Sequence, residues 1–203
     1  MTFGEALDEK KFLALCVDSF RGKNIGQLTE KEMQLAIANA LVEAGLKVFC
    51  EYPYPKSKDK CDIVLTKKDY LEVTHWIEIK PVWENGESNY WSLSKFFGEA
   101  PFREDIRKLS NLQMDGQDSK NWFLAIIMTE ESIADDLDAV ENPGKGKALA
   151  ASQMVKGISF WANGAQPIKA YSKENKVWFL LWPVEKFNET KIVPNKDGIY
   201  DLG

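Results

Sequence analysis

The sequence is poor in the residues that build disulfide and zinc sites. It holds three cysteines, Cys16, Cys50 and Cys61, and a single histidine, His75. The cysteines are widely spaced and odd in number, which indicates reduced, mostly buried thiols. With one histidine, neither a catalytic zinc centre nor a serine triad is favoured.

The sequence also lacks any apolar run close to the roughly 20 residues that span a bilayer. Its first residues, MTFGEALDEKKF, are acidic and mixed, unlike a secretory signal. These absences predict a cytoplasmic protein with no membrane partner. No GxxxxGK[ST] motif is present, so a P-loop ATPase is not supported.

An excess of positive charge is missing as well, because the formal net charge is −5. Such a chain does not coat nucleic acid through bulk charge. A metal-dependent nuclease nevertheless needs a carboxylate cluster, and local basic patches can hold phosphates. The charge therefore argues against tight, unassisted DNA binding. It does not exclude a nuclease or another protein that binds nucleic acid.

What is present is an alternation of helical and strand patterns. Helices are predicted over 4–21, 30–44, 102–113, 130–141 and 145–162, and strands over 46–54, 61–65, 76–80, 121–128 and 177–184. Thr29 and Glu32 form a capping-box sequence before the second helix. We expect one domain over 1–203, with a core at about 29–128 and a C-terminal helical region and strand at 130–190. The expected fold class is α/β, with three α/β/α layers around a central mixed β-sheet.

The two strands at 61–65 and 76–80 carry an unusual set of charged residues. They are predicted to form a hairpin, with the end of their polar connector extending the second strand. Asp62 lies in the first strand, and Glu78 and Lys80 share one face of the second because side chains alternate along a strand. Charged groups inside such apolar strands break the usual pattern, and such violations tend to mark function.

The alternative interpretation of these charges is structural. Glu78 and Lys80 would then form a solvated salt bridge on an edge strand, and Asp62 would be a residue at a strand start.

This order of elements, with Asp62 on one strand and Glu78-Ile79-Lys80 on the next, resembles the PD-(D/E)XK nuclease superfamily. The superfamily includes restriction endonucleases, Holliday-junction resolvases and Mrr-like enzymes. The resemblance covers about 29–128, and Cys61 stands where the motif's name has proline. It implies a restriction endonuclease-like fold and a Mg²⁺-dependent endonuclease that hydrolyses DNA phosphodiester bonds. It also implies a homodimer, since many nucleases of this fold dimerise to cut two strands.

The resemblance assigns roles to the charged set. Mg²⁺, or Mn²⁺ in its place, would be held by Asp62, Glu78 and the carbonyl of Ile79. Oxygen ligands of this kind suit a hard cation that serves phosphodiester hydrolysis. Lys80 would either position the attacking water or act as the general base, and both roles stay open.

The family usually adds an acid or amide from the helix before the sheet. Glu30 and Gln34 are four residues apart and share one helix face. Glu30 is therefore the expected contributor, with Gln34 beside it, whereas Glu32 is explained by the capping box.

Two further groups are candidates for DNA contacts. Arg103, Arg107 and Lys108 share the helix at 102–113 and could hold phosphates, and a solvated helix face is the alternative explanation. Trp83 and Trp91 follow the motif and could stack on exposed bases.

A second function class is a catalytically silent member of the same fold that binds a protein or nucleic-acid partner. The acidic net charge, the aromatic stretch after the motif and the lack of a recognisable target-recognition domain favour it. The intact set of Asp62, Glu78 and Lys80 favours the nuclease.

Overall fold

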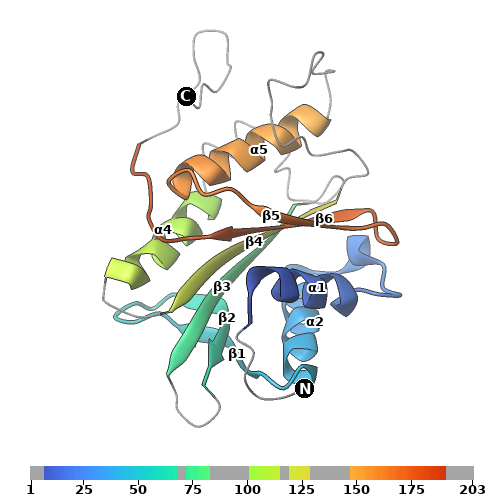
Figure 1. The fold of residues 1–203 in the computed structure, drawn as a ribbon, viewed down its shortest axis with the longest axis horizontal. Helices are drawn as coiled ribbons and strands as arrows, with labels where there is room; N and C mark the ends of the chain where they lie inside the picture. The colour runs from blue at the N-terminus through green and yellow to red at the C-terminus, as the bar shows by residue number, and fades with distance from the viewer. Residues whose placement is uncertain (1–6, 68–71, 83–100, 115–118, 129–146, 191–203) are drawn as a thin grey trace.

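The computed structural model describes residues 7–67, 72–82, 101–114, 119–128 and 147–190 (Figure 1). Its elements are α1 (Glu9–Ser19), the short 3-10 helix η1 (Ile25–Gln27), α2 (Glu30–Glu43), β1 (Lys47–Pro53), β2 (Lys60–Thr66), β3 (Val73–Val82), α4 (Pro101–Met114), β4 (Lys120–Met128), α5 (Lys147–Trp161), β5 (Ile168–Ser172) and β6 (Val177–Pro183). The helix expected at 130–141 and the residues Trp83 and Trp91 lie outside the described ranges. Within those ranges, no helix combines the length and apolar character that a membrane crossing requires.

Six strands form one mixed sheet in the order β1-β2-β3-β4-β6-β5. β3 and β4 are parallel, and the other neighbouring pairs are antiparallel. A parallel pair needs a crossover connection, and α4 lies in the connection from β3 to β4. The expected mixed sheet is therefore confirmed, with one strand more than the sequence predicted: β5, a short and half-buried edge strand.

Helices cover both faces of this sheet (Figure 1). Ile77 and Ile79 pack in the core on the α1 and α2 side. Trp76 and Phe123 pack in the core on the α4 and α5 side. The alternation expected for β3 is thus confirmed, and it directs Glu78 toward the α4 side of the sheet.

The start of α2 is set by local chemistry. The Thr29 hydroxyl accepts from the Glu32 backbone N–H at 3.2 Å, and the Glu32 carboxylate accepts from the Thr29 backbone N–H at 2.7 Å. This predicted capping box satisfies backbone donors that a helix start leaves unpaired. It also places Glu30 in the first turn of α2, beside the sheet.

Candidate active site

The candidate site lies where β2 separates from β3. The paired register ends at Ile63 and Ile77. Beyond that point Oδ2 of Asp62, not a backbone carbonyl, accepts the N–H of Ile79 at 2.7 Å. The Asp62 carbonyl in turn accepts from the side-chain amide of Gln34 on α2. Asp62 is therefore held at the separation by both its side chain and its backbone.

Glu78 lies beside Asp62 and is 2% exposed. Its Oε1 accepts a 2.6 Å hydrogen bond from the Tyr54 hydroxyl. Burial, followed by the negative charges of Asp62 and Asp105, raises the pKa of Glu78 well above its ordinary value. Burial also raises the pKa of Asp62, although the positive charge of Lys80 opposes that shift. Without a bound cation, this carboxyl pair therefore tends to retain a proton.

Lys80 joins the two helical layers. Its Nζ lies 2.9 Å from Oε1 of Glu30 on α2 and 3.5 Å from Oδ2 of Asp105 on α4. Burial acts to lower the pKa of Lys80, but the negative charges of Asp105, Asp62 and Glu30 outweigh it, so the net pKa is raised. Lys80 is therefore a stable cation among acids. With β3 inside the sheet and Glu78 buried, the solvated edge-strand salt bridge is excluded.

The structure thus brings together all five residues expected at the catalytic centre: Asp62, Glu78, Lys80, Glu30 and Gln34. Gln34 takes a different place from Glu30. Its amide donates to the Asp62 carbonyl and, at 3.4 Å, to Oε1 of Glu51, and it supports the β2 backbone.

Two residues of the site were missed by the sequence analysis, Asp105 and Tyr54. Asp105 had a readable signal: it follows Phe102 by three residues and precedes Leu109 by four, so it lies on the apolar side of α4. A nearly buried acid in that position is unusual. Tyr54 carried no such signal, because an aromatic residue at a strand end is ordinary.

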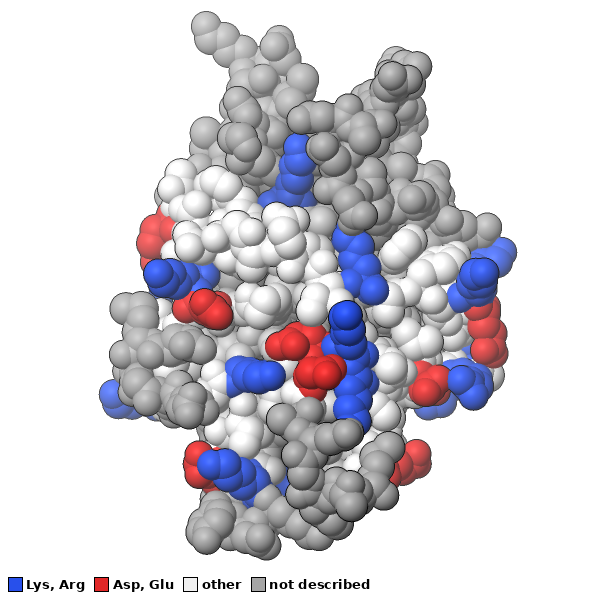
Figure 2. Space-filling view, viewed as in Figure 1, with Lys and Arg blue, Asp and Glu red and all other residues white. Residues whose placement is uncertain are grey.

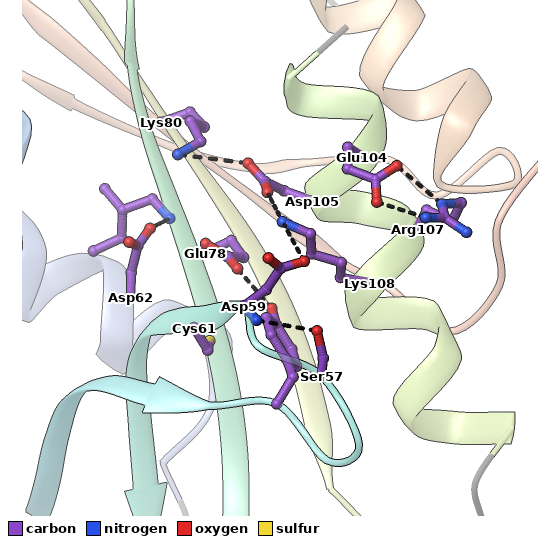
Figure 3. Close-up of polar contacts among 12 residues, drawn as sticks. Ser57, Asp59, Cys61, Asp62, Glu78, Lys80, Glu104, Asp105, Arg107 and Lys108 are labelled. Carbon is purple, nitrogen blue, oxygen red and sulfur yellow. Dashed lines mark hydrogen bonds and ion pairs between the residues drawn. The ribbon is translucent and has the colours of Figure 1, made fainter.

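The three basic residues expected to contact DNA have different surroundings, and Figure 3 shows two of them, Arg107 and Lys108. Lys108 faces the site, with Nζ 3.3 Å from Asp105 and 3.5 Å from Asp59. Arg107 forms a 2.6 Å ion pair with Glu104 on α4 and points away from Glu78. Arg103 belongs to a third environment: its guanidinium donates to the Glu189 carbonyl at 3.2 Å and lies over the Phe187 ring. The three side chains therefore have different partners, although they lie on the same helix.

The oxygen ligands at this site suit a small, hard cation that takes only a few of its ligands from the protein. In the described part of the chain, no group of three or more His, Cys, Asp or Glu side chains is arranged for a metal. Mg²⁺, however, is usually held by one or two carboxylates, with waters and substrate phosphate completing its shell. Asp62 and Glu78 supply two carboxyls whose mutual repulsion a cation would relieve. The Ile79 carbonyl points to the same gap as its N–H, because both groups of a strand residue face one neighbour.

The arrangement is therefore a pair of carboxyls, Glu78 buried and Asp62 half-buried, next to a lysine that pairs with Glu30 and Asp105, placed where β2 and β3 separate. Comparison of the chain with protein-family models, with curated proteins and with solved structures gave no match.

Proposed function

We propose that this protein is a metal-dependent nuclease with a restriction endonuclease-like fold that hydrolyses DNA phosphodiester bonds. One observation carries the proposal: Asp62 and Glu78 place two carboxyls side by side at the separation of β2 and β3, with the ammonium of Lys80 near them. An oxygen-rich cation site next to a fixed positive charge is what hydrolysis of a phosphodiester requires.

Each side chain has a task in this reaction. Asp62 and Glu78 would hold the cation, with the Ile79 carbonyl as a further ligand. A bound Mg²⁺ would supply Lewis-acid stabilisation of the phosphate and a more acidic water. Lys80 stays protonated because acids surround it. We therefore assign it to orienting the attacking water and offsetting charge on the phosphate, and not to general-base catalysis.

Glu30 and Asp105 hold the Lys80 ammonium from two sides. Glu30 is the more open partner, with 45% of its side chain exposed, whereas the Asp105 side chain is 11% exposed. A phosphate that approaches Lys80 from solvent therefore meets Glu30 first. Glu30 would have to turn aside or take part in binding the cation when DNA is bound.

The charge of the molecular surface favours a local DNA contact. Among the described residues on the face shown in Figure 2, lysines and arginines are interspersed with acids and do not gather into one basic surface. Lys108 is the basic residue of α4 that lies against the site, and its side chain is 23% exposed. It is the best placed of the three helix residues to contact a phosphate.

Lys108→Ala should weaken productive DNA binding more than Arg107→Ala. Both changes remove one positive charge from α4, but only Lys108 faces the carboxyl cluster. We expect KM for a labelled duplex to rise about tenfold in the Lys108 variant, which corresponds to about 1.4 kcal/mol. Steady-state cleavage at varied DNA concentration measures this. An equal rise in both variants would mean that only the overall charge matters.

The direct test of the proposed function is cleavage by the purified protein. Plasmid, linear duplex and single-stranded DNA are each incubated with Mg²⁺, Mn²⁺ or EDTA. We expect cleavage with either cation and none with EDTA. The range of substrates cut distinguishes nicking, double-strand cleavage and action on single strands.

A catalytically silent binding module is the second candidate, and the enclosure of Glu78 favours it. Glu78 is 2% exposed and satisfied by Tyr54, so the cluster could be a purely structural polar network. A folded protein that cleaves none of the substrates and shows no calorimetric signal with Mg²⁺ or Mn²⁺ would favour the binding module over the nuclease.

A further inference from the structure

The hydroxyl of Tyr54 is tied to the most enclosed carboxyl of the site. It donates to Oε1 of Glu78 at 2.6 Å, a short hydrogen bond in a buried setting. The two residues are 24 positions apart in the chain, and Tyr54 follows the end of β1 directly. This contact is therefore formed by the tertiary structure and not by local geometry.

Tyr54 itself is firmly placed. It is 6% exposed, and its ring stacks on that of Trp76 with centroids 5.3 Å apart and planes 9° from parallel. Its backbone N–H donates to the Asp59 carbonyl at 3.0 Å, which closes the turn between β1 and β2. Asp59 in turn pairs with Lys108 of α4 at 3.5 Å. The hydroxyl is thus held by a stacked ring, a closed turn and a contact with the neighbouring helix.

A buried carboxylate with one fixed oxygen has a fixed orientation. Because Oε1 of Glu78 accepts from Tyr54, rotation about the last side-chain bond is restricted and the second oxygen remains for another partner. Hydrogen bonds from neighbouring groups orient metal-binding side chains in this way, and their loss typically weakens metal affinity by about 10- to 100-fold.

We propose that Tyr54 is the positioning residue for Glu78: its hydroxyl fixes the carboxyl in the orientation that receives the divalent cation. The proposal rests on the nuclease function proposed above. It assigns Tyr54 no contact with DNA and no part in bond cleavage.

Tyr54→Phe tests the role, with Tyr52→Phe as its matched control. Both changes remove one hydroxyl from an aromatic residue that contacts the Trp76 ring, since Tyr52 meets it edge-on at 5.8 Å. Of these two tyrosines, Tyr54 donates to Glu78 and Tyr52 does not in the described structure. The phenylalanine keeps the stacking, so both variants should fold, and thermal unfolding checks this.

Mn²⁺ binding by isothermal titration calorimetry, without DNA, is the first readout. We expect Tyr54→Phe to raise the Kd for Mn²⁺ at least about tenfold and Tyr52→Phe to leave it unchanged. Cleavage at varied Mn²⁺ is the second readout. The cation concentration for half-maximal rate should rise by the same factor, whereas the rate at saturating Mn²⁺ should stay within about twofold of the unsubstituted protein, because the cleavage step is untouched.

The outcomes separate the two proposals. An unchanged Kd in Tyr54→Phe, or an equal change in both variants, overturns the positioning role while leaving the nuclease proposal standing. A selective loss of Mn²⁺ binding in a protein that cleaves no DNA supports the positioning role and rejects the nuclease. Absence of Mn²⁺ binding by the unsubstituted protein overturns the positioning role, and it overturns the nuclease proposal as well if that protein cleaves no DNA.

Discussion

Lys80→Ala should lower the rate of DNA cleavage by about 100- to 1,000-fold or more, the usual loss when one group that stabilises charge in the transition state is removed. The ammonium lies among Glu30, Asp105 and Asp62, where it can orient a water and offset the charge of a phosphate. In the alanine variant these acids lose their shared cation. Their negative charges would then also repel the approaching DNA. Initial rates on the best DNA substrate, with Mg²⁺ or Mn²⁺ in excess, measure the loss.

Two further variants test whether the loss of cleavage comes from the chemistry of the site and not from misfolding. Asp62→Asn keeps an oxygen that can accept the Ile79 N–H, so it should fold normally and still lose cleavage through its weakened cation site. Lys67→Ala removes an exposed lysine that follows the end of β2 opposite to Asp62 and pairs with Glu72 at 2.6 Å, and this variant should cleave normally. Full activity of Lys80→Ala and Asp62→Asn would refute the assignment of the site.

Glu78→Gln should make the cation-free protein more stable while removing its activity. The glutamine oxygen can still accept from Tyr54, but the buried position no longer carries an ionisable group next to Asp62 and Asp105. At pH 7 we expect a gain of about 0.5–2 kcal/mol in the free energy of unfolding, the usual scale of a single stabilising substitution. Thermal unfolding in EDTA should show it as a rise in Tm of about 2–4 °C per kcal/mol.

The gain should depend on pH in a defined direction. The pKa of Glu78 is raised in the folded protein, so between about pH 4.3, the ordinary glutamate value, and that raised pKa the unfolded chain binds fewer protons than the folded one. The stability of the unsubstituted protein therefore falls relative to the variant as pH rises through this window. Below it, both states are protonated at Glu78 and the advantage disappears.

Added Mg²⁺ should make the unsubstituted protein more stable than Glu78→Gln. A ligand that binds only the folded state stabilises it, so Mg²⁺ should raise the Tm of the unsubstituted protein and leave Glu78→Gln nearly unchanged. Glu72→Gln, at an exposed ion pair, serves as the control and should show neither effect. A Glu78→Gln variant that is less stable than the unsubstituted protein at pH 7 would contradict the charge distribution described above.

The sequence by itself determined the elements whose signals are local. The capping box of Thr29 and Glu32 depends on residues three apart, and it starts α2 as predicted. The strand at 121–128 is buried on both faces and appears as a continuous apolar run. Alternation along β3 similarly separated Glu78 from Ile77 and Ile79, because a strand turns successive side chains to opposite faces. β5 was not predicted, since a half-buried edge strand has a weak hydrophobic pattern.

Only the tertiary structure decided which groups meet. Lys80 and Glu30 are 50 residues apart, and Glu78 and Tyr54 are 24 apart. Asp105 reaches Lys80 because α4 packs its apolar side on the sheet, which turns one acid inward. The rotation of a helix against a sheet is set by all of its packed side chains together, so residue spacing identified the charged groups but not their partners.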